Sequence, residues 1–92
     1  MKVQAEVSLY PLRTMKLSGP VVAFCHVLRS QGLDVQTRSM SSFVTGDSKV
    51  MFKALSEGFT RLAQEDEIVM DVRVSNACPD TAGQNLDVER VD

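Results

Sequence analysis

Tryptophan, cysteine, proline and long apolar runs are all scarce in this 92-residue chain, which has no Trp, two Cys and three Pro. Two cysteines are too few for the disulfide framework of a small secreted domain, so a reducing cytoplasm is the expected compartment. Apolar runs such as residues 20–24 fall far short of the roughly 20 residues of a membrane-spanning helix. No basic-then-apolar leader opens the chain. We therefore expect a cytoplasmic protein with no membrane segment.

An excess of charge of one sign is also missing. Lys and Arg number 10 against 12 Asp and Glu, which gives a formal net charge of −2, and no basic block occurs. Binding to a phosphate backbone needs a basic stripe, so nucleic acid is not an expected partner. The 43% apolar and 24% charged fractions are those of a folded globular domain. We expect one domain over residues 1–80, followed by an acidic C-terminal tail over residues 81–92.

Motifs for catalysis and metal binding are absent as well. The single histidine, His26, lies off the apolar face expected for its helix, and no C-x-x-C or H-E-x-x-H spacing occurs. The five glycines are isolated, so no phosphate-binding loop is present. Cys25 falls on the apolar face and is expected to be a buried small hydrophobe, whereas Cys78 follows the last strand. We expect a protein that is not an enzyme, with no catalytic residue, cofactor or metal.

Periodicity predicts the first half of the fold. Apolar and polar residues alternate from Val3 to Leu9, which indicates a half-buried strand that stops near Pro11. A helix is expected to begin near Ser18 and to end at Gly32. Its apolar stripe has spacings of three and four residues and consists of Val21, Phe24, Cys25 and Leu28.

The second half repeats this pattern. Residues 34–39 and 41–45 predict a hairpin that turns near Met40 and Ser41. Asp47 is placed to cap a second helix, and Gly58 inside that helix indicates either close packing or a tolerated flaw. The stripe expected to be buried is Phe52, Leu55, Phe59 and Leu62. The final predicted strand alternates from residue 68 to residue 75.

The resulting order, βαββαβ, predicts an α+β, ferredoxin-like fold. Right-handed crossovers give an antiparallel sheet with the strand order 4-1-3-2 and both helices on one face. The opposite face of the sheet is then left without a helix. The residues expected on this uncovered face are Gln4, Glu6, Ser8, Tyr10, Val69, Asp71, Arg73 and Ser75.

Hydroxyl groups gather at one end of the predicted sheet. Ser8 and Tyr10 at the end of the first strand come near Ser41 and Ser42 at the start of the third, with Met40 at the turn. Hydroxyls both donate and accept hydrogen bonds, so they suit a flat heterocycle that presents alternating donors and acceptors. The alternative is that these serines satisfy loose backbone groups at strand ends. The spacing leaves both interpretations open.

A second polar group is expected at the other end of the sheet. It comprises residues at the ends of several strands, and the capping role of Asp47 is the simpler explanation of that carboxylate. Whether these residues form a second site stays open. They are Gln4, Glu6, Thr45, Asp47, Ser75 and Asn76.

Four segments occur in a telling order and spacing: Val7-Ser8-Leu9-Tyr10-Pro11-Leu12, Met40-Ser41-Ser42-Phe43-Val44-Thr45-Gly46, Val50-Met51-Phe52-Lys53-Ala54, and Ile68-Val69-Met70 followed by Ser75-Asn76-Ala77-Cys78-Pro79. Together they resemble the YkoF-like thiamine/hydroxymethylpyrimidine-binding family, and the likeness covers the chain to about Asp80. The chain resembles a single-domain member of that family.

The resemblance implies a ferredoxin-like domain that binds thiamine or its hydroxymethylpyrimidine moiety without transforming it. It places the ligand at Ser8, Leu9, Tyr10, Ser41 and Ser42, and the turn adds Met40. It also implies a homo-oligomer formed through sheet faces, as a homodimer or as a homotetramer built from two dimers. An aromatic ring such as Tyr10, or a carboxylate such as Glu6, would favour the cationic thiazolium of thiamine.

Two other functions remain as alternatives. The first is an oligomeric interaction or regulatory domain with no small-molecule ligand. The second is a small hydrolase of the acylphosphatase type, which shares the topology and would use Arg13 with Asn76, although the glycine-rich anion loop of such enzymes is missing.

Overall fold

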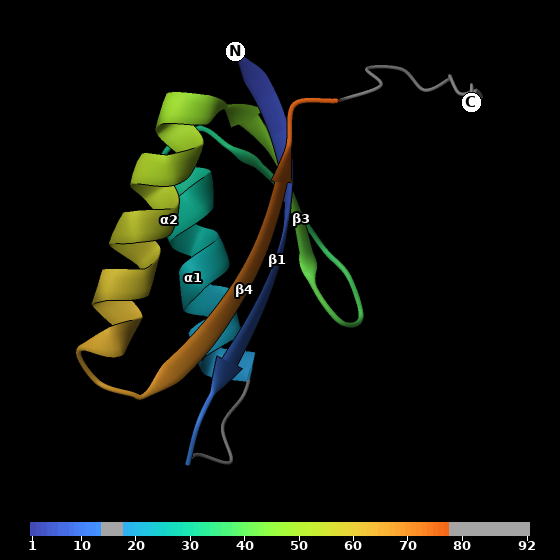
Figure 1. The fold of residues 1–92 in the computed structure, drawn as a ribbon. Coiled ribbons are helices and arrows are strands. Elements are labelled where there is room, and N and C mark those ends of the chain that lie inside the picture. The colour runs from blue at the N-terminus through green and yellow to red at the C-terminus, as the bar shows by residue number, and fades with distance from the viewer. Residues whose placement is uncertain (14–17, 78–92) are drawn as a thin grey trace.

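Six elements follow one another in the order βαββαβ in the computed structural model, which describes residues 1–13 and 18–77 (Figure 1). The predicted tail over residues 81–92 and Cys78 lie outside the described residues. The elements are β1 (Lys2–Pro11), α1 (Ser18–Ser30), β2 (Asp34–Thr37), β3 (Ser42–Asp47), α2 (Ser48–Ala63) and β4 (Ile68–Ser75).

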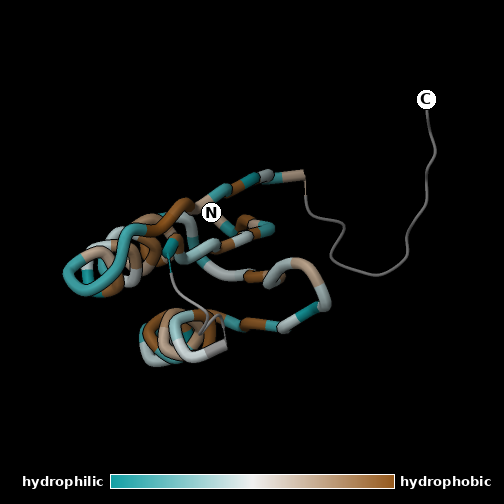
Figure 2. Tube along the Cα trace, turned by 90° about the horizontal axis from the view of Figure 1, so that it is seen from below, coloured by the Kyte–Doolittle hydropathy of each residue, from teal (hydrophilic) through white to brown (hydrophobic). Residues whose placement is uncertain are grey.

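The strands form one antiparallel sheet in the order β2-β3-β1-β4, which confirms the predicted order read from its other edge. Both helices lie on the same side of this sheet, as the view in Figure 2 shows. The predicted α+β, ferredoxin-like architecture is therefore confirmed. Neither described helix has the length and apolar character needed to cross a membrane.

Strand β1 forms the centre of the sheet and shows the predicted alternation. Val3, Ala5 and Val7 are buried beneath the helices, whereas Glu6 is exposed on the other face. The strand runs as far as Pro11, which is paired with Ile68 in the ladder. Because proline has no amide hydrogen to donate, the next amide continues the pairing, and Leu12 N donates to Glu67 O at 2.7 Å.

Helix α1 buries the face that the sequence predicts. Phe24, Cys25 and Leu28 are buried, and His26 is exposed. The helix ends at Ser30, two residues before Gly32, which has φ 90°. The amide of Gly32 donates to Arg29 O at 3.0 Å and the amide of Leu33 donates to Leu28 O at 3.3 Å. This pair of bonds is the Schellman arrangement, which needs a residue that adopts positive φ without strain.

Helix α2 is rotated relative to the prediction. The buried residues are Met51, Ala54, Leu55 and Gly58, whereas Phe52 and Phe59 are 57% and 37% exposed. The predicted stripe was therefore wrong at both phenylalanines and right at Leu55.

The reason for this rotation is the contact between the two helices. A Cβ atom at Gly58 would lie 2.8 Å from both Cδ1 and Cε1 of Phe24, so only a glycine lets α2 approach α1 this closely. Gly58 therefore marks close packing and not a tolerated flaw.

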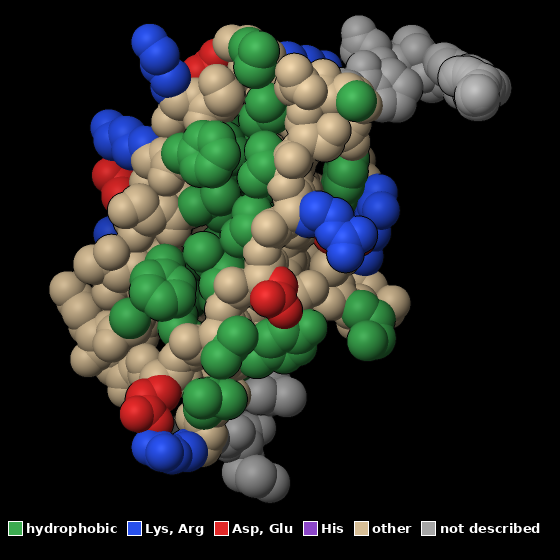
Figure 3. All heavy atoms as spheres, viewed as in Figure 1, with side chains coloured by type: hydrophobic (Ala, Val, Ile, Leu, Met, Phe, Trp, Pro, Cys, Tyr) green, Lys and Arg blue, Asp and Glu red, His purple; other side chains and the backbone are tan. Residues whose placement is uncertain are grey.

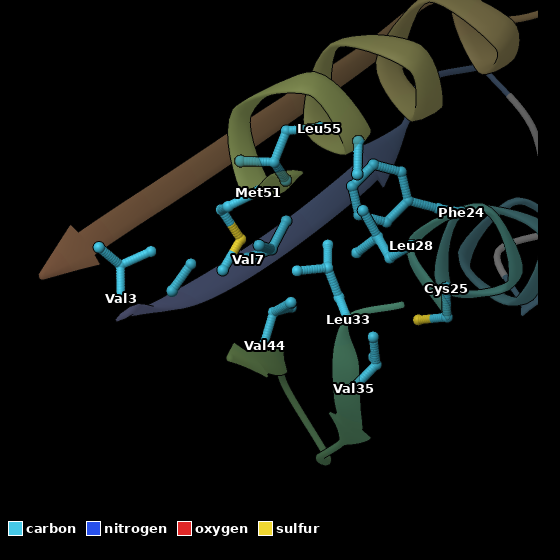
Figure 4. Packing of buried hydrophobic residues seen from close by; sticks show 12 residues of the cluster. Val3, Val7, Phe24, Cys25, Leu28, Leu33, Val35, Val44, Met51 and Leu55 are labelled. Carbon is cyan, nitrogen blue, oxygen red and sulfur yellow. The ribbon is translucent and has the colours of Figure 1, made fainter. Parts of the chain in front are cut away.

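The core lies between the helices and the sheet (Figure 4). The largest fully buried side chains are Phe24 and Leu28 from α1, Val44 from β3 and Met51 from α2. The opposite face of the sheet carries the cross-strand pairs Gln4–Ser75, Glu6–Arg73, Ser8–Asp71 and Tyr10–Val69. We call it the bare face, because neither helix covers it, as predicted.

Candidate ligand-binding site

A cavity of about 270 Å³ lies at one end of the sheet, beneath the first half of α1. The floor comes from the end of β1, with Val7 and Leu9, and from Ser42 at the start of β3. Val21 and Phe24 of α1 close the apolar side. Thr37 at the end of β2 and residues 38–41, which connect β2 to β3, form the outer wall. The walls are mainly apolar, which is typical of a small-molecule site with a few polar groups for orientation.

Five of the six predicted site residues line this cavity: Leu9, Tyr10, Met40, Ser41 and Ser42. The sixth, Ser8, does not belong to the lining. Neighbouring side chains of a strand point to opposite faces, so Leu9 points beneath α1 and Ser8 points to the bare face. On the bare face, the Ser8 hydroxyl donates to the backbone carbonyl of Met40 at 3.3 Å. This bond ties the segment between β2 and β3 to β1.

Ser42 is the buried polar group of the cavity. It lies opposite Val7 in the sheet and is 5% exposed, so its side chain points inward among apolar neighbours. Its Oγ lies 3.5 Å from Sγ of Cys25, which is a weak hydrogen-bond partner. The hydroxyl is therefore placed to bind a polar atom of a ligand inside the cavity.

The outer wall is built by the tight connection between β2 and β3. The Arg38 amide donates to Ser41 O at 2.7 Å and closes the turn near the residues predicted for it. The Ser41 hydroxyl donates to Oε2 of Glu6 at 3.3 Å. Met40 and Tyr10 are 81% and 48% exposed and form the rim.

Sequence reasoning missed several residues of the wall. Val21 and Phe24 were placed on the apolar stripe of α1 but were not assigned to a site, and Arg38 was not singled out. The Arg38 guanidinium lies 4.5 Å from the centre of the Phe43 ring. Arg38 is the one charged residue among the described residues that line the cavity, but Phe43 lies opposite Glu6 on the bare face, so the guanidinium stacked on that ring places its charge outside the cavity.

The polar group at the other end of the sheet centres on Asp47, which caps α2. Its carboxylate accepts hydrogen bonds from the amides of Lys49 and Val50 at 3.0 and 3.4 Å, and from the N-terminal amino group at 3.0 Å. These bonds, first that from the amino group and then that from Lys49, hold the pKa of Asp47 below its ordinary value. Within residues 1–13 and 18–77, no cluster of metal-binding side chains occurs.

The hydrolase alternative is wrong on geometry. Arg13 pairs with Glu67, just before β4 begins, whereas Asn76 follows the last residue of β4. A strand of this length separates the two side chains by roughly 25 Å. They cannot act on one substrate.

The topology, the one-sided helix layer and the cavity at the end of the sheet define a ferredoxin-like α+β domain with a cavity of small-molecule size. The chain belongs to the YKOF-related family, whose pattern it matches over residues 2–81. A comparison with curated proteins gives no match.

Solved structures of the same fold come from several organisms. The hypothetical protein MJ1052 of Methanocaldococcus jannaschii has a TM-score of 0.77 and 27% identity, over 90% of this chain and 87% of that one. The putative thiamine biosynthesis/salvage protein TM0486 of Thermotoga maritima has a TM-score of 0.72 and 16% identity, over 80% and 82%. A domain of unknown function, DUF77, from Bacillus cereus has a TM-score of 0.70 and 15% identity, over 91% and 83%.

Proposed function

We propose that this protein binds thiamine or its hydroxymethylpyrimidine moiety in the cavity beneath α1, without transforming it. The observation that carries the proposal is the buried Ser42 hydroxyl, which points into a mainly apolar cavity. Membership in the YKOF-related family supports the choice of ligand, as does the likeness to the putative thiamine biosynthesis/salvage protein of Thermotoga maritima.

The cavity is large enough for one ring of thiamine and not for both. About 270 Å³ falls just below the roughly 300–1,000 Å³ of pockets that enclose drug-sized ligands. We place the aminopyrimidine inside, against Phe24 and Leu9, with a ring nitrogen or the exocyclic amine bonded to the Ser42 hydroxyl. The remainder of thiamine then lies at the rim beside Tyr10.

The two candidate ligands differ in charge. The thiazolium of thiamine is cationic and gains on the order of 0.5–2 kcal/mol from a ring such as Tyr10. Hydroxymethylpyrimidine is neutral and lacks this gain, so we expect thiamine to bind at least as tightly as hydroxymethylpyrimidine.

Calorimetric titration of the wild-type protein and of Ser42→Ala with both compounds tests the proposal. Loss of one buried hydrogen bond weakens binding by roughly 5- to 30-fold. Ser56→Ala on the exposed side of α2, which does not line the cavity, is the matched control and leaves both dissociation constants unchanged. Absence of both heat and a thermal shift at millimolar ligand contradicts the proposal and favours the interaction or regulatory domain.

A further inference from the structure

Ser42 carries the one buried polar side chain among the described residues. The groove between α2 and β4, which lies on the apolar stripe in Figure 3, has hydroxyls at Ser56 and Thr60, but both residues are exposed. An exposed hydroxyl bonds to water whichever way its proton points, whereas a buried one needs a partner in the protein or in a ligand. The direction of the Ser42 hydroxyl proton therefore determines which kind of ligand atom can bind there.

The partner of the Ser42 hydroxyl is the thiol of Cys25. The two atoms, Oγ and Sγ, are 3.5 Å apart. Cys25 is 2% exposed, points from α1 toward the sheet (Figure 4) and does not line the cavity. In the part of the chain that the structure describes, neither side chain makes another hydrogen bond. The bond therefore runs in one of two directions: either the thiol donates to Oγ, or the hydroxyl donates to Sγ.

We propose that Cys25 is a positioning residue whose thiol donates to Oγ of Ser42 and so directs the hydroxyl proton into the cavity. The ligand atom that Ser42 binds is then an acceptor. This inference rests on the proposed function and narrows it. A ring nitrogen of the pyrimidine, which accepts, bonds to Ser42, and the exocyclic amine, whose lone pair is delocalised into the ring, does not.

The relative strengths of the groups select this direction. A hydroxyl is a stronger donor than a thiol, and an aromatic nitrogen is a stronger acceptor than sulfur. When the thiol donates to Oγ, the hydroxyl proton goes to the ligand nitrogen, so the strong donor meets the strong acceptor. When the hydroxyl donates to Sγ, the same proton is bound by the weakest acceptor of the site, and the ligand must supply a donor instead.

Infrared spectroscopy tests the direction of the bond without any ligand. In a background with Cys78→Ser, Cys25 is the only thiol, and a thiol that donates a hydrogen bond has a lower S–H stretching frequency than a free one. We expect a lowered frequency that rises in Ser42→Ala. Ser41→Ala, which removes a cavity hydroxyl bonded to Glu6, is the matched control and leaves the band in place. A band that stays in place or falls in Ser42→Ala overturns the proposal.

Cys25→Ala measures what the thiol contributes to binding. Loss of this weak donor is expected to weaken the binding of hydroxymethylpyrimidine roughly 2- to 5-fold, and to have no effect on binding in a Ser42→Ala background. An equal loss in both backgrounds means that Cys25 acts through packing, and it overturns the positioning role.

Calorimetric titration with two analogues of hydroxymethylpyrimidine identifies the ligand atom that meets the hydroxyl. One analogue has a methyl group in place of the exocyclic amine, and the other has CH in place of both ring nitrogens. We expect Ser42→Ala to weaken binding of the first analogue roughly 5- to 30-fold, as for the parent compound, and to leave binding of the second unchanged. If the loss disappears with the first analogue, Ser42 bonds to the amine, and this inference is overturned while the proposed function stands. Failure of the wild-type protein to bind the parent compound rejects the proposed function itself.

Discussion

Gly58 determines how closely the two helices pack, so a single methyl group is expected to matter there. Alanine is intrinsically the better helix former by about 1 kcal/mol. Its Cβ would nevertheless lie 2.8 Å from two ring atoms of the buried Phe24, and overpacking of this kind costs roughly 1–3 kcal/mol. We expect Gly58→Ala to lower the free energy of unfolding by up to about 2 kcal/mol in urea denaturation.

Lys53→Ala on the exposed side of the same helix is the control, and we expect it to change stability by less than about 0.5 kcal/mol. If Gly58→Ala stabilises the protein, the helices are able to separate freely, and the close packing inferred here is wrong.

Asp47 links stability to pH. Its pKa is lowered in the folded protein, so the folded state holds its proton less tightly than the unfolded chain does. Stability therefore rises with pH through the acidic range, is fully present above the ordinary pKa of aspartate, and is lost as the pH falls toward the lowered value. We expect Asp47→Ala to lower Tm by a few degrees near neutral pH and to converge on the wild-type Tm in acid.

Asp47→Asn serves as the control, because asparagine keeps an oxygen that accepts from the amides of α2 but has no charge to titrate. Its Tm is expected to lie between those of the other two proteins near neutral pH. A constant gap between wild type and Asp47→Ala in thermal melts down to low pH would contradict this role.

At the scale of the elements, the strands were predictable and the rotation of α2 was not. Alternation identifies the buried face of a strand without reference to its neighbours, as in β1. Two faces of α2 were candidates for burial, one with Met51 and Gly58 and the other with Phe52 and Phe59. Both include Leu55, and they differ by one position, which is about 100° of helix rotation. The close contact of Gly58 with the Phe24 ring of the neighbouring helix favours the face with Met51 and Gly58.

The candidate site could also be predicted only in part, because its shape depends on how neighbouring elements pack. The hydroxyls and the turn could be predicted, because β1 and β3 are antiparallel and bring Tyr10 toward Ser41. That Ser8 points away follows from alternation, but the cavity itself depends on where α1 lies over the sheet. For that reason the roles of Val21, Phe24 and Arg38 emerge only from the assembled fold.

The ring of Tyr10 at the rim of the cavity is expected to rank the ligands. Tyr10→Leu removes the aromatic face, so we expect thiamine to bind severalfold less tightly and hydroxymethylpyrimidine to change by less than twofold. Calorimetry with both compounds measures the two effects. Arg61→Gln, exposed on α2, is the control, and an equal effect of Tyr10→Leu on both ligands would mean that Tyr10 acts by shape.

For the molecule as a whole, the proposed ligand binding makes thermal stability depend on ligand concentration. A ligand that binds the folded but not the unfolded chain adds stability by mass action, so Tm rises with ligand concentration. We expect this rise in scanning calorimetry of the wild-type protein with thiamine, and a smaller rise for Ser42→Ala. The Ser56→Ala variant should behave as wild type, and a wild-type Tm that is independent of ligand concentration would count against the proposed site.

The brevity of β2 has a consequence for aggregation. This outer strand has only four residues, with the pattern exposed, buried, exposed, exposed. It therefore offers few main-chain partners and little apolar surface to an incoming strand. Fibre growth by addition of strands at this edge of the sheet is disfavoured for that reason.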